Sequence, residues 1–442
     1  MKILVITYYW PPSGGSGVQR WLKFVKYLKR KGWEPVVYTV ENGEYPALDY
    51  SLEKEIPKDV TVIKKKIWEP YSAYKFLSGR KKKDEITITN VQQNKKISVG
   101  NRISKWIRAN LFVPDPRVFW VKPSVKFLEN YLKQNKIDCI ITSGPPHSLH
   151  LIGMKLKEKT GVKWIADFRD PWRTNYFLQQ LGMSKSTWKK QLALEKKVVD
   201  GADKIIVVTR TMKEEFEEMA RGKVEIITNG YDEEDFSSSS VVGRETNNTM
   251  ETNNKFSIVF TGTFVNSQNP ELLWKVLDEK VNAEENFKNE LEIKLTGTIG
   301  DAVRKSLEEN NLLAFTTFKN YLPHNEIVIE QQNAQVLLLS VNNTPNAKLI
   351  LTGKLFEYLA SGRPILCFCP PDGDAGEIIN ECKAGYVLNY TDKEKIKTAI
   401  AHLFTNFKNQ NLPTRKTGFE KYSREKLTER LMEVVGEVVN KI

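Results

Sequence analysis

Short apolar runs alternate with amphipathic stretches from the start of the chain. Residues 3–8 form an apolar run rich in β-branched side chains, and residues 18–31 carry apolar side chains at helical spacing before Gly32. Residues 35–40 are typical of a second strand. Strand, glycine-rich loop, helix and strand in this order predict a βαβ unit, whose strands lie parallel in one sheet.

The same alternation continues to about residue 235 and begins again after residue 255. Between them, residues 237–254 are polar and nearly free of large apolar side chains, which is typical of a linker or an exposed loop. A second polar stretch, 79–100, indicates an insertion in the first half. We therefore predict two α/β domains. Further strands are expected at 138–142, 162–166, 204–208, 224–227, 256–260, 291–296, 336–341, 364–369 and 385–388, with helices at 124–134, 149–160 and 185–200.

Length and composition agree with two globular domains. The chain has 442 residues, of which 40% are hydrophobic and 27% charged, and one hydrophobic core rarely organises so many residues. No apolar run approaches the roughly 20 residues that span a bilayer, and no secretory signal follows Lys2. We expect a cytoplasmic protein, with peripheral association at the inner face of the cell membrane as an alternative.

Potential metal ligands are scattered along the chain. The four cysteines and four histidines show neither zinc-finger nor HExxH spacing, and the cysteines are interpreted as small buried side chains in strands. The one Asp-x-Asp sequence, Asp372-Gly373-Asp374, follows two prolines and is interpreted as a turn. We expect no bound metal and no cofactor.

Positive charge is concentrated in one region. The net charge is +13, and residues 51–123 contain 17 Lys or Arg against 7 Asp or Glu. Basic and aromatic side chains interleave at 102–122, which favours an anionic lipid interface. A solvated face, a core helix with outward-reaching cations and a single-stranded nucleic-acid site are the alternatives. The side chains concerned are Arg102, Lys105, Arg108, Arg117 and Lys122, with Trp106, Ile107, Leu111, Phe112, Phe119 and Trp120.

A glycine cluster lies between the first predicted strand and the first predicted helix. In the segment 13–17, S-G-G-S-G, the unbonded N–H groups of the helix start and the helix dipole form a natural site for phosphate or pyrophosphate. Arg20 stands where the dinucleotide motif needs its third glycine, which disfavours a dehydrogenase. A turn without a ligand is the alternative.

The strongest local signal is the block 352–368. It predicts a helix that begins at Thr352, ends before Gly362 and is followed by a buried strand. Lys354 and Glu357 share a face near the helix N-terminus, where an ammonium can meet phosphate and a carboxylate can accept hydrogen bonds from ribose or sugar hydroxyls. A solvated Lys–Glu pair is the alternative.

This block looks like the donor-binding helix of GT-B fold glycosyltransferases, and the whole chain resembles glycosyltransferase family 4 (glycosyl transferases group 1). Further segments resemble the family in its order: T-S-G-P-P-H at 142–147, D-F-R-D-P-W at 167–172, T-N-G-Y-D at 228–232 and F-T-G-T at 260–263. The resemblance implies an α/β GT-B fold, with two Rossmann-like domains that face a cleft. The expected limits are 1–236 for an acceptor-side domain with a basic insertion near 79–123, 237–254 for the linker, 255–420 for a nucleotide-sugar domain and 421–442 for a helix that crosses back to the first domain.

The resemblance also implies an activity. A sugar would move from a nucleoside-diphosphate sugar to a glycan or lipid-linked acceptor in surface polysaccharide or glycolipid synthesis, with retained configuration and without a metal. His147 resembles the family histidine that contacts the donor sugar, Glu357 resembles the residue that binds the ribose, and Asp170 is a second catalytic candidate. The implied donor-binding residues are Gly15, Ser16, Gly17, Arg210, Gly262, Thr263, Gly353, Lys354, Leu355 and Glu357.

The sequence departs from the family pattern at two places. Leu349 stands where a glutamate is common, and residues 262–274 lack the basic residues that often follow the glycine turn. Lys354 is the nearest replacement for neutralising phosphate, with Arg210 and Lys348 as further candidates.

Alternatives to this interpretation stay open at both levels. His147 could be a capping or core histidine, and Asp167 and Asp170 could bond backbone amides at a strand end. A sugar-nucleotide epimerase is the alternative enzyme. A non-catalytic protein that binds anionic membranes or nucleic acid is the alternative of another class, although no nucleic-acid module accompanies the basic region.

Overall fold

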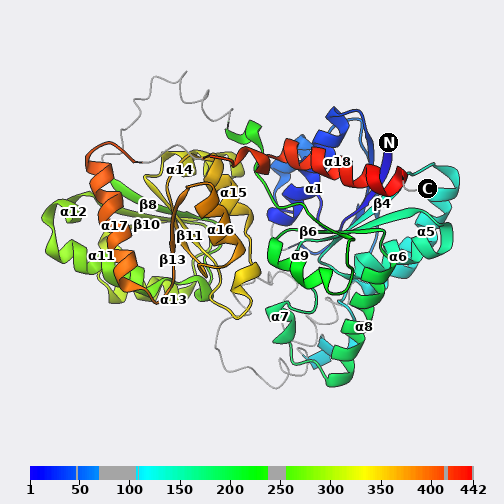
Figure 1. The fold of residues 1–442 in the computed structure, drawn as a ribbon, viewed down its shortest axis with the longest axis horizontal. Coiled ribbons are helices and arrows are strands. Elements are labelled where there is room, and N and C mark those ends of the chain that lie inside the picture. Colours follow the sequence, from blue (N-terminus) through cyan, green and yellow to red (C-terminus); the bar gives the residue numbers. More distant parts are fainter. Residues whose placement is uncertain (46–47, 69–105, 108, 237–254, 413–416, 441–442) are drawn as a thin grey trace. The chain divides into compact units, whose positions relative to one another are not determined.

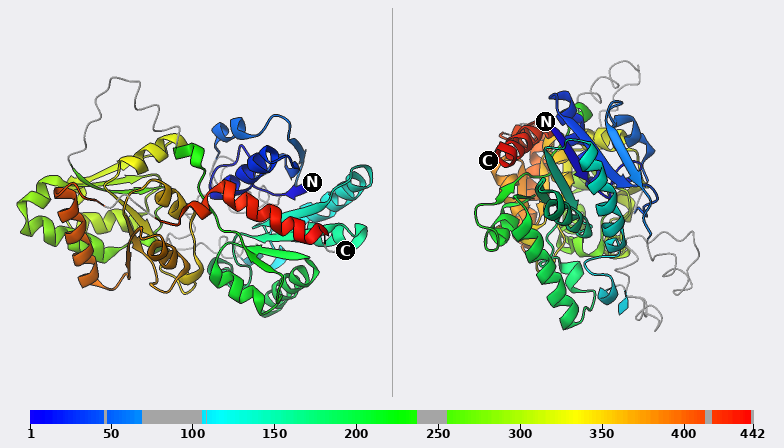
Figure 2. Two further views of the ribbon diagram at one scale, coloured as in Figure 1. Left: turned by 45° about the horizontal axis from the view of Figure 1, so that its top comes forward. Right: turned by 90° about the vertical axis from the view of Figure 1, so that its right-hand side faces the viewer.

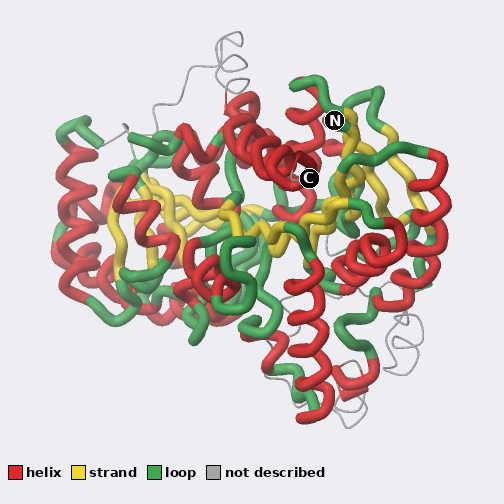
Figure 3. Tube along the Cα trace, turned by 45° about the vertical axis from the view of Figure 1, so that its right-hand side comes forward, coloured by secondary structure: helices red, strands yellow, loops and turns green. Residues whose placement is uncertain are grey.

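The computed structural model describes residues 1–45, 48–68, 106–107, 109–236, 255–412 and 417–440. The chain divides into an N-terminal unit, Met1–Thr228 with Glu425–Ile442, and a C-terminal unit, Asn229–Arg424. Each unit is built on one parallel sheet with helices packed around it (Figures 1 and 3). The expected linker and most of the expected insertion lie outside the described residues, and the domain limits drawn from the sequence remain predictions.

Seven strands form the sheet of the N-terminal unit, in the order β3-β2-β1-β4-β5-β6-β7. The central strands are apolar and fully buried because helices cover both faces of a parallel sheet. The strands are β1 Lys2–Ile6, β2 Glu34–Val40, β3 Thr61–Lys65, β4 Cys139–Gly144, β5 Lys163–Phe168, β6 Lys204–Val207 and β7 Val224–Ile226. The helices are α1 Ser16–Arg30, α5 Val118–Gln134, α6 Ser148–Thr160, α7 Tyr176–Gln179, α8 Lys185–Gly201, α9 Arg210–Glu217 and α18 Arg424–Asn440.

Six strands form the sheet of the C-terminal unit, in the order β10-β9-β8-β11-β12-β13. Separate apolar clusters pack on its two faces. The strands are β8 Phe256–Thr261, β9 Leu291–Thr296, β10 Thr316–Lys319, β11 Val336–Ser340, β12 Ile365–Phe368 and β13 Gly385–Leu388. The helices are α11 Glu271–Ala283, α12 Glu285–Glu290, α13 Asp301–Glu309, α14 His324–Asn333, α15 Gly353–Ala360, α16 Asp374–Glu381 and α17 Lys393–Lys408.

Both sheets contain a point where the strand order reverses. In the N-terminal unit the order changes direction between β1 and β4, and in the C-terminal unit between β8 and β11. The loops after these two strands leave toward opposite sides of the sheet, and ligands of open α/β sheets bind at such points, outside the carboxyl ends of the strands. The glycine segment 13–17 follows β1, His147 follows β4, and the helix that carries Lys354 follows β11.

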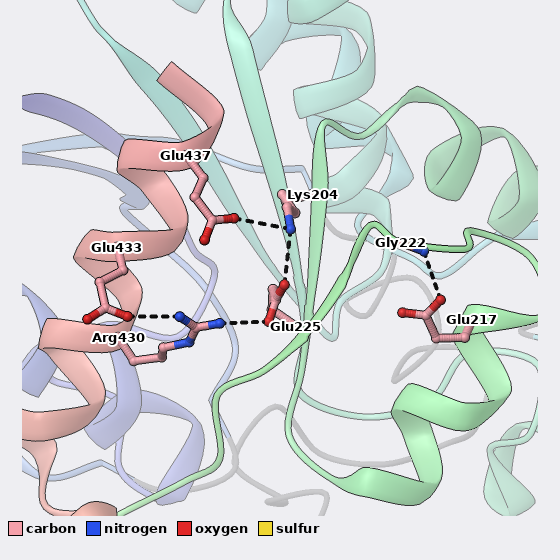
Figure 4. A network of polar contacts seen from close by, with 7 residues as sticks. All are labelled: Lys204, Glu217, Gly222, Glu225, Arg430, Glu433 and Glu437. Atoms are coloured by element: carbon pink, nitrogen blue, oxygen red, sulfur yellow. Dashed lines mark hydrogen bonds and ion pairs between the residues drawn. The ribbon is translucent and has the colours of Figure 1, made fainter. Parts of the chain in front are cut away.

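The last helix, α18, belongs to the N-terminal unit. Its apolar side chains, Leu427 and Leu431 among them, join the core formed by β1 and α1, alongside which α18 lies (Figure 2). Ion pairs fix it at two points. Lys31 contacts two of its glutamates at 2.9 Å each, and Arg430 contacts Glu225 of β7 at 2.9 Å, which in turn holds Lys204 at 3.0 Å (Figure 4).

The α/β alternation predicted from the sequence is confirmed, except that one edge strand of each sheet was missed. Strands β3 and β10 were not predicted, because each is short, lies at an edge and mixes exposed lysine and threonine with apolar residues. Trp120, grouped with the basic stretch in the sequence, is buried and stacks on Tyr38 with ring centroids 5.0 Å apart. None of the described helices is long and apolar enough to cross a membrane.

Candidate functional site

Two glycines shape the loops at the reversal point of the C-terminal sheet. Gly262 has φ 99° and Gly297 has φ 115°, a region that side chains rarely allow. The Gly262 N–H donates to the Thr296 carbonyl at 2.7 Å, and a Cβ on Gly297 would lie 2.3 Å from the Gly262 carbonyl oxygen. The turns after β8 and β9 therefore touch backbone to backbone, which leaves Thr263 at an open strand end beside α15.

Lys354 lies across this glycine turn. Its ammonium is 3.5 Å from the Thr263 carbonyl oxygen and 4.1 Å from the centroid of the Phe260 ring, and a Cβ on Gly262 would come within 3.2 Å of it. Burial lowers the pKa of Lys354 to about 8, while the nearby Glu357 carboxylate acts in the opposite direction. The structure thus brings together Gly262, Thr263, Lys354 and the N-terminal turn of α15, which begins at Gly353.

The carboxylate of Glu357 accepts a hydrogen bond from a buried amide side chain. Gln331, a fully buried residue of α14, donates from Nε2 to Glu357 Oε2 at 3.1 Å and to Thr261 Oγ1 at 3.3 Å. Among the described residues, Oε1 of Glu357 has no hydrogen-bond partner. The carboxylate is therefore oriented on one side and available on the other, which suits the binding of paired hydroxyl groups. Gln331 was not among the residues predicted from the sequence.

The remaining candidates near α15 differ in access. Leu355 is fully buried in the core, so only its backbone can reach a ligand. Lys348 is exposed and forms an ion pair with Asp372. Gly373 precedes α16, and Asp374 is its first residue, so the Asp-x-Asp segment starts a helix as part of a turn. Across the described ranges, no group of three or more His, Cys, Asp or Glu side chains could hold a metal ion.

In the N-terminal unit, a half-buried arginine, Arg169, lies against the start of α1. Gly15 precedes this helix with φ 95°, and Ser16 and Gly17 are its first residues. A Cβ on Gly17 would lie 2.3 Å from Nη1 of Arg169, and Nη2 of Arg169 donates to the Pro145 carbonyl. The guanidinium adds a full positive charge to the positive end of the helix dipole, so this glycine segment favours an anion. Arg169 was also not predicted as a site residue.

His147 is fixed by a ring stack. Its imidazole lies parallel to the Trp172 indole, with centroids 4.6 Å apart and planes 6° from parallel. Trp172 is itself buried and donates to Gln191 Oε1 at 2.8 Å. Burial, with the nearby His150 and Arg169, holds the pKa of His147 well below its usual range, so the ring is neutral near pH 7. Its Nδ1 has no hydrogen-bond partner among the described residues.

His150 faces the same glycine as His147. Its Nδ1 is hydrogen-bonded to Thr142 Oγ1 at 2.9 Å, and burial lowers its pKa to about 3. A Cβ on Gly144 would lie 2.5 Å from His150 Nε2 and 3.2 Å from His147 Nδ1. The absence of a side chain at Gly144 therefore leaves space next to two imidazole nitrogens that no described residue hydrogen-bonds.

The two aspartates at the end of β5 have different surroundings. Asp167 is fully buried and accepts from Arg20 at 2.8 Å, from Trp21 at 2.9 Å and from Ser143 at 2.9 Å. Asp167 thus links α1 to β4 and β5, a structural role in which its partners are side chains rather than backbone amides. Asp170 is exposed in the same loop as Trp172, and its catalytic role remains a prediction. Arg210, the first residue of α9, is paired with Glu214 at 3.8 Å.

Known proteins share both the segment and the fold. The family described as Glycosyltransferase Family 4 matches residues 91–235, about one third of the chain. The fold resembles sucrose-phosphate synthase from Thermosynechococcus elongatus, with TM-score 0.62, 13% identity, and 99% of this chain and 98% of that chain covered. It resembles Anabaena HepE in complex with UDP, with TM-score 0.62, 11% identity, and coverage of 99% and 100%.

A third similar structure is WaaG, a glycosyltransferase involved in lipopolysaccharide biosynthesis, with TM-score 0.56, 13% identity, and coverage of 99% and 100%. No curated protein sequence gave a match. The chain has the GT-B fold. Within this GT-B fold, the glycine segment 13–17 and His147 follow the strands at the reversal point of the N-terminal sheet, and Thr263 and Lys354 follow those of the C-terminal sheet. Asp170 and Arg210 follow β5 and β6 instead, and the roles of all these residues remain predictions.

Proposed function

We propose that this protein is a glycosyltransferase, which transfers a sugar from a nucleoside-diphosphate sugar, UDP-linked in the first instance, to a glycan or lipid-linked acceptor in surface polysaccharide or glycolipid assembly. The observation that carries the proposal is the placement of Lys354 and Glu357 on the first turns of α15, with Lys354 against the glycine turn at Gly262. A similar structure binds UDP and another serves lipopolysaccharide biosynthesis, which supports the choice of nucleotide and acceptor.

Each group has a separate role in this proposal. Glu357 binds the ribose hydroxyls through its unengaged oxygen. Lys354 and the N–H groups at the start of α15 neutralise the diphosphate, whose negative charge grows as the bond to the sugar breaks, so their effect is larger in the transition state. The α1 N-terminus with Arg169 favours an anionic group in the same way. His147, neutral and unpartnered at Nδ1, contacts the donor sugar, and we propose transfer with retention of configuration.

A panel of UDP-, GDP- and ADP-sugars tests the proposal by thermal shift and by product analysis. A donor at about 100 times its dissociation constant stabilises the folded protein by about 2.7 kcal/mol. We expect the UDP-sugars to raise the unfolding temperature, and release of UDP to require an acceptor glycan or glycolipid. An epimerase would instead change the donor sugar without an acceptor, and proton NMR of the sugar nucleotide would reveal that product. Lack of any stabilisation by the panel would contradict the proposal.

A further inference from the structure

Exposed aromatic side chains gather at one edge of the N-terminal unit. Trp68, just beyond the edge strand β3, is 63% exposed and meets Phe119 of α5 edge to face, with centroids 5.0 Å apart. Phe119 is 43% exposed and contacts Phe112 at 5.7 Å. Leu111, next to Phe112, is 63% exposed. Large apolar side chains that cluster on a surface mark an interaction site more often than single ones do. We call these four residues the aromatic patch.

Uncompensated positive charge runs from this patch along β3 and α5. The two segments lie side by side, since Lys65 stands 4.1 Å above the Phe127 ring while Trp68 meets Phe119. Residues 61–68 and 117–127 contain six Lys or Arg and no Asp or Glu. The exposed lysines among them are Lys64, Lys65, Lys66, Lys122 and Lys126, and within the described ranges none of these five forms an ion pair.

The chemistry of this surface selects its partner. Indole and phenyl rings prefer the interface between lipid headgroups and acyl chains, and lysines around them attract anionic headgroups. A protein partner would need acidic groups matched to each lysine, whereas an anionic bilayer satisfies Lys65, Lys122 and Lys126, which lie on the α5 side with the patch, without any fixed geometry. We propose that the aromatic patch and its lysines dock the protein onto an anionic lipid bilayer. This deepens the proposed function, since a lipid-linked acceptor lies in a membrane. Only the biological purpose of membrane docking, and not the docking itself, rests on the proposed function.

The docking surface differs from the basic stretch suggested by the sequence. Trp120 is buried, so it cannot enter a bilayer, and the surface includes Lys65 of β3 and Trp68, which lie outside residues 102–122. Arg102, Lys105 and Arg108 lie outside the described residues and have no part in the inference.

Co-sedimentation of the full chain with vesicles tests the proposal. With vesicles of equal parts phosphatidylcholine and phosphatidylglycerol at low salt, we expect the wild type to bind and to be released at about 1 M salt, where the Debye length is about 3 Å. The triple variant Lys65→Gln, Lys122→Gln, Lys126→Gln should lose about 100-fold in partition, since each lysine near such a surface contributes about fivefold. Trp68→Ala and Phe119→Ala should each cost about tenfold.

Matched controls separate this surface from general charge and hydrophobicity. The triple variant Lys185→Gln, Lys189→Gln, Lys190→Gln changes the same charge on exposed positions of α8, and Tyr321→Ala removes an aromatic ring that is 65% exposed in the C-terminal unit. Both should bind vesicles as the wild type does. Failure of the wild type to bind, or equal losses in the controls, would overturn the proposal.

Two further readouts assign the cause of any loss. Sedimentation velocity without lipid shows whether the patch variants dissociate an oligomer; if they do, the patch is an interface between copies and the proposal is wrong. Turnover of the nucleotide sugar with a water-soluble acceptor should be unchanged in the patch variants. Vesicle binding without any such turnover would contradict the proposed function alone, and turnover without vesicle binding would contradict this inference alone.

Discussion

The contact between Gln331 and Glu357 allows a quantitative test of the donor site. Replacing Glu357 with Gln removes the charge that strengthens its hydrogen bonds to ribose, and hydrogen bonds to charged groups contribute about 1.5–3 kcal/mol. Donor affinity should therefore fall roughly 10- to 140-fold. Gln331→Leu keeps similar volume and leaves the carboxylate in place without its 3.1 Å orienting bond. We expect a smaller loss of about 1 kcal/mol, roughly fivefold, because the free carboxylate must be ordered again on binding.

Calorimetric titration of UDP into the single variants and the double variant measures both effects. If Gln331 acts through Glu357, the double variant should bind no more weakly than Glu357→Gln alone, which is a non-additive result. Glu381→Gln is the matched control, since this exposed carboxylate lies on the neighbouring α16 and pairs with Lys421. Wild-type affinity in well-folded Glu357→Gln would refute the assignment of the ribose site. Additive losses would refute the orienting role of Gln331.

The other predictions address charge, packing and metals. Since the pKa of Lys354 is lowered to about 8, its ammonium is lost as the pH rises through that value, and kcat/KM of the wild type should fall above pH 8. The variant Lys354→Met should be slower and should show no such fall. A fall above pH 8 that persists in this variant would contradict the role of Lys354. Arg20→Met leaves the buried carboxylate of Asp167 without its cation and should destabilise the protein by about 3–5 kcal/mol in urea unfolding. A loss below about 1 kcal/mol would contradict the structural importance of this ion pair. Gly297 has a positive φ, and Gly297→Ala places a Cβ against the Gly262 carbonyl oxygen, so it should lower the free energy of unfolding by about 2 kcal/mol or more. An unchanged unfolding midpoint would show that the turn rearranges to accept the side chain. Donor binding and transfer should persist in EDTA, and activity that is lost and then restored by manganese would mean that a metal is required.

The sequence predicts the fold well where burial alone sets the pattern. The central strands are continuous apolar runs and the helices between them have a clear period, so β8 and β11 each end within one residue of the predicted limit. The edge strands β3 and β10 escape prediction because only part of each is buried, and lysine and threonine fill their exposed positions. Trp120 could not be placed either, since its burial depends on Tyr38, which lies some 80 residues away in the chain.

The candidate site is predictable only for residues that belong to a local motif. Lys354 and Glu357 stand out because glycine and helix signals surround them. Gln331 and Arg169 do not, because their importance comes from neighbours in other elements. One signal was available for Gln331, since an amide on the same helix face as buried Val328 needs a polar partner. For Arg169, the missing Cβ at Gly17 becomes meaningful only once the two segments are seen together.

The attachment of α18 to the N-terminal unit has a consequence for biosynthesis. The core around β1 contains Leu431 and its neighbours, which leave the ribosome after the whole of the C-terminal unit. At roughly 5–20 residues per second, synthesis of everything after Thr228 takes about 10–40 s, during which the nascent N-terminal unit presents an open apolar groove on α1 and β1. The C-terminal unit, contiguous in sequence, can complete its fold within that interval. A chaperone that shields the groove on the nascent chain would therefore act until α18 emerges, and a premature stop just before α18 would leave the first unit, rather than the second, unfinished.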